Sequence, residues 1–82
     1  ANRVYIGPEV QIKEGAILLP GCSIAHHSTI GELCSISDNA TIGGNVFIHE
    51  RTLIGLNATI NRRVKVEHSK VIKSGETVYN DC

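Results

Sequence analysis

The sequence predicts an all-β protein, a parallel β-helix that winds through six-residue repeats. Every sixth residue from Ile6 to Val78 is a branched aliphatic residue, without exception or insertion. A period of six matches neither the 3.6-residue period of a helix nor the two-residue period of an ordinary strand, and it is typical of hexapeptide β-helices. This aliphatic row consists of Ile6, Ile12, Leu18, Ile24, Ile30, Ile36, Ile42, Ile48, Ile54, Ile60, Val66, Ile72 and Val78. Its side chains are expected to stack into one continuous core.

A second row of mostly small or β-branched residues lies two positions before the aliphatic row. Residues two apart in a strand face the same side, so both rows are expected to point inward. The small row consists of Val4, Val10, Ala16, Cys22, Ser28, Cys34, Ala40, Val46, Thr52, Ala58 and Val64. The pattern fails only at Lys70 and Glu76, so we expect the last coil to be frayed, or covered by something that is absent from this chain.

The turns give the length of one coil. Three repeats make a triangular coil of 18 residues, so residues 18 apart are expected to stack at roughly 4.8 Å, the spacing of paired strands. The dipeptides Pro20-Gly21, Asp38-Asn39, Leu56-Asn57 and Ser74-Gly75 recur at this interval and end in residues that tolerate a left-handed backbone. The 82 residues therefore form one domain of a little over four coils. Ala1 and the ending Asn80-Asp81-Cys82 suggest a module or a fragment of a longer chain, without an N-terminal sugar-binding domain.

Composition narrows the function. A domain of this size is marginally stable alone, and a short β-helix has open ends, so we expect an oligomer. Zero net charge and few aromatic residues (Tyr5, Phe47, Tyr79) argue against nucleic-acid binding. No membrane-length apolar run or signal peptide is present, and a soluble protein is expected. Most basic residues follow residue 50, namely Arg51, Arg62, Arg63, Lys65, Lys70 and Lys73, so this half is suited to an anionic ligand.

The cysteines point to a reducing compartment. Cys22 and Cys34 belong to the small inward row, and Cys82 is the last residue. We expect two buried thiols and one exposed thiol in a cytoplasmic protein. Because no Cys-x-x-Cys pair occurs, a zinc site is disfavoured.

Two adjacent histidines are the main candidates for chemistry. His26 and His27 occupy the third and fourth places of a repeat, at a corner outside the core. Counting in eighteens puts Gly44 one coil above His26 and Arg62 two coils above. Gly44 is expected to leave a vacant, backbone-lined space beside the imidazole, where a ligand can approach the main chain. The alternative, strongest for His27, is that exposed turns simply tolerate polar residues.

Several motifs resemble the left-handed β-helix domain of hexapeptide acyltransferases. They are Thr29-Ile30-Gly31, Ala40-Thr41-Ile42-Gly43-Gly44-Asn45-Val46, Ile54-Gly55-Leu56-Asn57-Ala58 and Ser74-Gly75-Glu76-Thr77-Val78. The likeness covers nearly the whole chain and is greatest to the sialic-acid and nucleotide-sugar O- or N-acetyltransferases. It implies a left-handed coil, a homotrimer, and transfer of an acetyl group from acetyl-CoA to a hydroxyl or amine of a sugar or nucleotide-sugar.

The resemblance also implies roles for individual residues. His26 occupies the place of the catalytic histidine, the general base that deprotonates the acceptor as it attacks the thioester. A backbone N–H near Gly44 would stabilise the oxyanion. Acetyl-CoA would bind between subunits, with main-chain contacts at Gly44, Leu56, Ser74 and Gly75 and with Arg62, Arg63 and Lys73 near its phosphates. A solvated edge is the alternative for the arginines.

The chain departs from this family beside the histidine. The family has an acidic residue next to it, where this chain has Ala25 and His27, and a second family histidine is Ser35 here. Glu9, one coil below His27, is a candidate substitute, and a neighbouring subunit is another. The main alternative function is therefore a non-catalytic β-helical trimerisation or binding module.

Two further columns give weaker signals. Glu14, Glu32, Glu50 and His68 stack on another corner, where like charges repel and a cation would relieve them, but solvated carboxylates are the preferred interpretation and no metal site is predicted. A β-helical carbonic anhydrase is disfavoured because the four histidines lack that family's five-residue histidine pair. Ser23, Thr41, Thr59 and Thr77 form an outward column that we interpret as ordinary sheet surface or a subunit contact.

Overall fold

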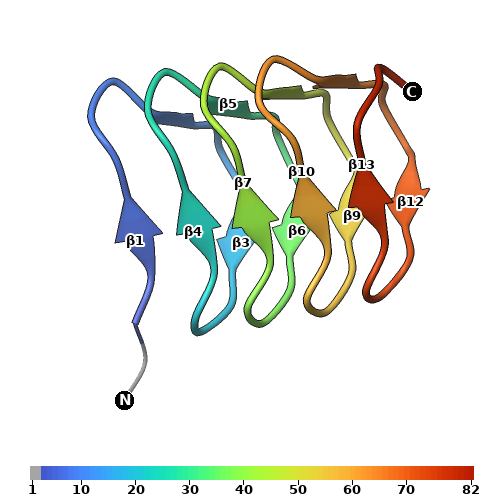
Figure 1. The fold of residues 1–82 in the computed structure, drawn as a ribbon. Coiled ribbons are helices and arrows are strands. Elements are labelled where there is room, and N and C mark those ends of the chain that lie inside the picture. The colour runs from blue at the N-terminus through green and yellow to red at the C-terminus, as the bar shows by residue number, and fades with distance from the viewer. Residues whose placement is uncertain (1–2) are drawn as a thin grey trace.

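A computed structural model describes residues 3–82 as a left-handed parallel β-helix of about four coils, without helices (Figure 1). Each strand has two residues, an outward residue followed by a member of the aliphatic row. The strands are β1 (Tyr5–Ile6), β2 (Gln11–Ile12), β3 (Ile17–Leu18), β4 (Ser23–Ile24), β5 (Thr29–Ile30), β6 (Ser35–Ile36), β7 (Thr41–Ile42), β8 (Phe47–Ile48), β9 (Leu53–Ile54), β10 (Thr59–Ile60), β11 (Lys65–Val66), β12 (Val71–Ile72) and β13 (Thr77–Val78). The predicted fold is confirmed.

Every third strand pairs, which produces three flat faces. The first sheet has the order β1-β4-β7-β10-β13, the second β2-β5-β8-β11, and the third β3-β6-β9-β12. All pairs are parallel, with residues 18 apart in register, such as Ile6 with Ile24 and Ile30 with Ile48. The predicted coil length is therefore confirmed.

Three corners join these faces, and all three use a left-handed backbone. We name them the first corner (residues 7–10, 25–28, 43–46 and 61–64), the second corner (13–16, 31–34, 49–52 and 67–70) and the third corner (19–22, 37–40, 55–58 and 73–76). The third corner contains the predicted column, with Gly21 at φ 84° and Asn39 at 60°. The other two repeat this geometry with side chains that give no signal of it, such as Leu33 at 59° and Arg63 at 63°. Closure of the coil therefore requires a positive φ even at residues such as Leu33 and Arg63, whose types rarely adopt one.

The core consists of both inward rows. From Cys22 onward the aliphatic row is at most 7% exposed, and Ile24, Ile36 and Ile48 are fully buried. Buried polar side chains of the small row form hydrogen bonds with backbone groups. The Ser28 hydroxyl donates to the Gly43 carbonyl at 2.7 Å and accepts from the Val46 N–H at 3.1 Å. Within residues 3–82, no buried polar side-chain atom lacks a hydrogen-bond partner.

Glycines after the aliphatic row allow the coils to approach. A Cβ at Gly31 would lie 2.7 Å from backbone atoms of His49 and Glu50, and a Cβ at Gly55 would lie 2.6 Å from the Ser74 nitrogen. Side chains at these positions would push adjacent coils apart. The Ile-Gly pairs are therefore required by packing.

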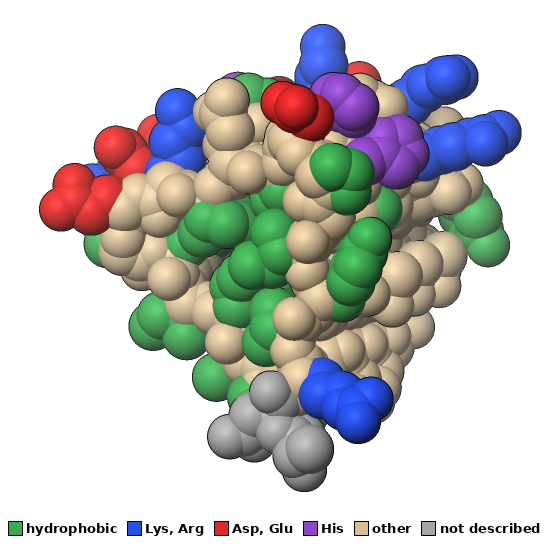
Figure 2. All heavy atoms as spheres, turned by 90° about the vertical axis from the view of Figure 1, so that its left-hand side faces the viewer, with side chains coloured by type: hydrophobic (Ala, Val, Ile, Leu, Met, Phe, Trp, Pro, Cys, Tyr) green, Lys and Arg blue, Asp and Glu red, His purple; other side chains and the backbone are tan. Residues whose placement is uncertain are grey.

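The N-terminal end of the described coil is the one that exposes its core. In the first coil Ile6 is 48% exposed and Ile12 is 37% exposed, whereas the same row is 0% exposed at Ile24 and Ile30. Figure 2 looks onto this end and shows hydrophobic side chains gathered at its centre. Coil-on-coil contact, and not the pattern itself, buries the row.

The prediction of a frayed last coil is wrong. β12 pairs with β9 and β13 with β10, and Val78 is only 7% exposed. The Asp81 carboxylate accepts a hydrogen bond from the Lys65 N–H at 2.9 Å, and the Cys82 carbonyl accepts one from Glu67 at 2.7 Å. These contacts pair the outer edge of β11 with residues 81–82. Lys70 is exposed and needs no inward space.

The cysteines are free thiols, and two of them occupy the core. Cys22 and Cys34 are buried, as predicted, and burial raises the pKa of both thiols. They therefore stay protonated and unreactive near neutral pH. Cys82 is partly buried against the core, so the expected exposed thiol is only partly accessible.

Candidate functional site

The first corner presents the two histidines side by side in solvent. His26 and His27 are both exposed, and their Nδ1 atoms lie 3.1 Å apart. The two rings meet edge to face, with centroids 5.3 Å apart and an interplanar angle of 84°. The ring hydrogen bond of His27 thus goes to His26.

The backbone confirms the stack counted from the sequence. The Asn45 N–H donates to the His26 carbonyl at 2.9 Å, and the Arg63 N–H donates to the Gly44 carbonyl at 2.9 Å. Toward the N-terminus, the His27 N–H donates to the Pro8 carbonyl at 3.1 Å. The corner residues are therefore locked to the coils on both sides.

Gly44 makes room that the His26 ring itself fills. A Cβ at Gly44 would lie 2.7 Å from His26 Nε2 and 2.9 Å from Cε1. The prediction of a vacant space beside the imidazole is wrong. The absence of a side chain at Gly44 lets the imidazole of His26 lie along the corner, and the ring occupies that space. The Gly44 N–H donates to no other residue in the described part of the chain.

Basic side chains extend the same corner. Arg62 and Arg63 are exposed, with Arg63 at φ 63° and the Arg62 N–H donating to the Asn61 side-chain oxygen at 2.9 Å. Figure 2 shows histidine and basic side chains adjoining one another at one edge of the end view. Glu9 occupies the coil before His27 in the same column, at φ 61°. An anion at this corner would meet cationic groups.

The remaining candidate cofactor residues lie elsewhere. Leu56, Ser74 and Gly75 belong to the third corner, where the Gly75 N–H donates to the Leu56 carbonyl at 2.8 Å. Leu56 is 47% exposed, and a Cβ at Gly75 would meet no atom within 4 Å. A single chain therefore does not bring these residues to Gly44, Arg62 and Arg63.

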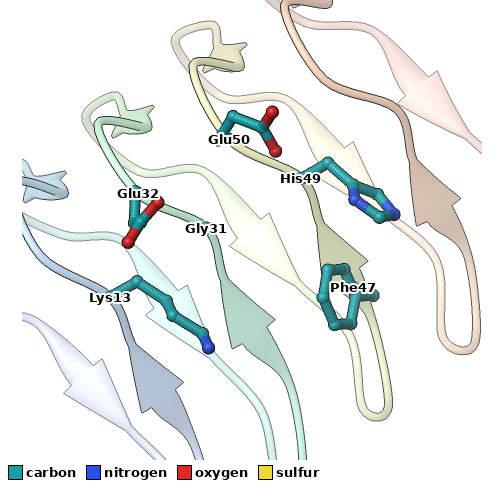
Figure 3. A pocket seen from close by; sticks show the side chains of 6 residues that line it. All are labelled: Lys13, Gly31, Glu32, Phe47, His49 and Glu50. Atoms are coloured by element: carbon teal, nitrogen blue, oxygen red, sulfur yellow. The ribbon is translucent and has the colours of Figure 1, made fainter.

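A surface hollow on the second corner had no clear signal in the sequence. It has a volume of about 170 Å³ and is lined by Lys13, Gly31, Glu32, Phe47, His49 and Glu50 (Figure 3). The rings of Phe47 and His49 lie 4.5 Å apart at 42°. The sequence indicated that Lys13 and His49 lie near the stacked glutamates, but not the hollow itself, which depends on side chains from three coils. Within residues 3–82, no group of three or more His, Cys, Asp or Glu side chains is placed to hold a metal ion.

No helix with the length and apolar character for crossing a bilayer exists in the part of the chain that the structure describes. A comparison with curated proteins gave no significant match.

Solved structures resemble the chain at low similarity. One is the N-terminal domain of CcmM in complex with CcmN, with 15% identity, a TM-score of 0.48, and coverage of 98% of this chain and 94% of that chain. Another is a mutant of perosamine N-acetyltransferase from Caulobacter crescentus in complex with CoA and GDP-perosamine. It has 15% identity, a TM-score of 0.40, and coverage of 94% of this chain and 50% of that one. At these scores neither structure bears on what this chain does.

The sequence match is to a family of repeats. Residues 9–44, a segment that contains both corner histidines and Gly44, match the model of the bacterial transferase hexapeptide, six repeats long. The remaining coils continue the same register through Val78. The chain is thus a left-handed β-helix of hexapeptide repeats, of which those within residues 9–44 match the bacterial transferase model.

Proposed function

We propose that the chain is an acetyl-CoA-dependent acyltransferase domain in which His26 is the general base. The observation that carries this proposal is the exposed His26 imidazole, held at Nδ1 by His27 and folded over Gly44 within the segment that matches transferase repeats. The acceptor is a hydroxyl or amine of a sugar or nucleotide-sugar. The two buried, protonated thiols favour a reducing compartment, the cytoplasm.

The proposed reaction uses one proton acceptor and one N–H donor. His26 takes the proton from the acceptor as its oxygen or nitrogen attacks the thioester carbonyl carbon. The Gly44 N–H, which donates to no described residue, is available for the developing oxyanion. When the carbon–sulfur bond breaks, the thiolate of CoA takes the proton back from His26. Atoms and charge are thereby balanced without another reactant.

The placement of the candidate CoA residues favours a site between protomers. Gly44, Arg62 and Arg63 lie on the first corner, and Leu56, Ser74 and Gly75 lie on the third. A ligand that uses both sets must contact the first corner of one copy and the third corner of another. Such heterologous contacts form a ring when the rotation between copies closes, and a homotrimer is the ring that we propose.

The third sheet offers the apolar surface that such a ring requires. Its outward residues are Ile17, Ser35, Leu53 and Val71, and the three apolar ones are 54%, 42% and 64% exposed. Leu19, which follows β3, is 37% exposed. The corresponding residues of the first sheet are Tyr5, Ser23, Thr41, Thr59 and Thr77, of which only the first is a large apolar residue. Leu53 and Val71 are direct neighbours on this face, and adjoining exposed apolar side chains mark interaction sites.

Charge on this apolar face is expected to separate the protomers. Light scattering should give wild type three times the chain mass of 8.8 kDa. The variant Leu53→Glu/Val71→Glu should give one chain mass, because the charges would be buried without partners. The matched control Thr41→Glu/Thr59→Glu, on the first sheet, should remain a trimer. If only the control dissociates, the threonine face is the interface.

Acetyl-CoA is expected to stabilise the fold. A ligand that binds only the folded state adds about 2.7 kcal/mol at a hundredfold excess over its Kd. For a domain of this size that corresponds to an increase in Tm of roughly 10–20 °C. The variant Arg62→Gln/Arg63→Gln should need more acetyl-CoA for the same shift, because charge-assisted contacts to phosphate are lost. Wild type that shows no shift at millimolar acetyl-CoA would contradict the proposal and favour the non-catalytic module.

A further inference from the structure

The hydrogen bond between the two histidines couples their tautomers. Neutral imidazole has one N–H donor and one bare acceptor nitrogen. Because the His26 and His27 rings face each other through Nδ1 at 3.1 Å, one Nδ1 must carry a proton and the other must not. Two arrangements satisfy this contact, and they differ in which nitrogen of His26 is free.

Hydrogen bonds to adjacent coils hold the main chain of both histidines in place. His27 is fixed at φ 61°, and its N–H donates to the Pro8 carbonyl at 3.1 Å. The His26 carbonyl accepts from the Asn45 N–H at 2.9 Å, and the Nε2 edge of its ring lies against Gly44, 2.7 Å from the place of a Cβ. The edge-to-face arrangement at 84° aims one Nδ1 at the other. The contact is therefore a consequence of the corner geometry.

We propose that His27 is a positioning residue that holds His26 in the tautomer with a free Nε2. In this arrangement the His26 Nδ1–H donates to the bare Nδ1 of His27, whose own proton is on Nε2. The inference rests on the proposed function, since only a bare Nε2 lets His26 accept a proton from the acceptor group. It gives His27 the task that an adjacent carboxylate would otherwise perform, without adding a negative charge.

The alternative partner is Glu9, which precedes His27 in the corner column. Its carboxylate makes no hydrogen bond to either ring in the structure, whereas the two rings are in direct contact. The basic residues Arg62 and Arg63 extend the column on the other side. The neutral imidazole of His27 suits this setting, because it accepts the hydrogen bond from His26 Nδ1–H without forming an ion pair with the arginines.

Nitrogen-15 NMR of the imidazoles at a pH above neutrality tests the tautomer directly. Wild type should show His26 protonated at Nδ1 and bare at Nε2, with the reverse for His27. In His27→Ala, His26 should lose this single tautomer. The control variants Glu9→Gln and His49→Ala, the latter on the second corner, should leave the His26 signals unchanged. Wild-type His26 protonated at Nε2, or a His26 tautomer that survives His27→Ala, would overturn the inference.

Kinetics separates positioning from general structure. His27→Ala should lower kcat by about 10–100-fold, the usual loss for a group that orients a functional imidazole, with KM for acetyl-CoA unchanged. His27→Asp should restore kcat and move the pH profile to higher pH, because a carboxylate favours protonated His26. An equal loss in His27→Asp would contradict the positioning role. The NMR result does not require turnover, so a correct tautomer in a protein without transferase activity would refute the proposed function alone.

Discussion

Replacing Ile48 with alanine is expected to lower the free energy of unfolding by about 2–5 kcal/mol. Ile48 is 0% exposed and is stacked between Ile30 and Val66, its partners in β5 and β11. Backbone hydrogen bonds between coils fix the positions of these neighbours, so they cannot move in to fill the cavity. The loss should therefore include a cavity term beyond the transfer of the deleted carbons. Urea denaturation at a fixed protein concentration measures it.

The matched control is Ile6→Ala in the same row. Ile6 is 48% exposed and pairs with Ile24 on one side only. Its truncation removes less buried surface and leaves no closed cavity, so we expect a loss of about 1 kcal/mol. Equal losses in the two variants would mean that the first coil is as well buried as the third. That result would contradict the open N-terminal end seen in the described residues.

The fold was predictable because the repeat leaves no freedom in register. A shift of one residue would move Ile42 and its equivalents from the core to solvent, so the aliphatic row determines which residues face inward, and the recurring turn column gives the 18-residue pairing. The wrong prediction of a frayed last coil also came from the repeat pattern. Burial depends on the coil 18 residues away, which a periodic pattern does not report. Ile6 therefore fits the pattern and is exposed, while Val78 is buried although the small row had failed beside it.

The sequence predicted which residues of the site stack in one column, but not which side chains contact one another. Counting in eighteens placed His26 beside Gly44 and on the same corner as Arg62, and the hydrogen bonds between coils confirm that stack. It could not give the direction of a side chain, so the space at Gly44 was expected to be empty and is filled by the imidazole. The contact between His26 and His27 likewise depends on the positive φ of His27. The sequence does not indicate this φ, because the residue is neither glycine nor asparagine.

The division of the cofactor candidates between two corners also follows from the triangular coil. Residues 44 and 56 are twelve apart, which is two sides of the triangle, so Gly44 and Leu56 lie on different corners. In the linear sequence these two residues are close to one another. The coil separates them and makes a second protomer part of any site that uses both.

Replacing His26 with alanine is expected to lower acetyl transfer by about 10²–10⁴-fold, the usual contribution of a general base. The imidazole is exposed, so the variant should unfold at nearly the wild-type temperature. The proposed phosphate contacts of Arg62 and Arg63 and the Gly44 N–H do not require the ring. Acetyl-CoA should therefore stabilise the variant as much as wild type. Steady-state kinetics together with thermal denaturation measures both quantities.

The control for this loss is His68→Ala. His68 is equally exposed but lies on the second corner, where its ring contacts Ser69 at 3.4 Å. Its removal should change neither kcat nor the stabilisation by acetyl-CoA. If His26→Ala kept wild-type turnover, His26 would have no part in the chemistry. If it lost acetyl-CoA binding and turnover together, the ring would be a binding group over Gly44, and the base would have to come from another residue.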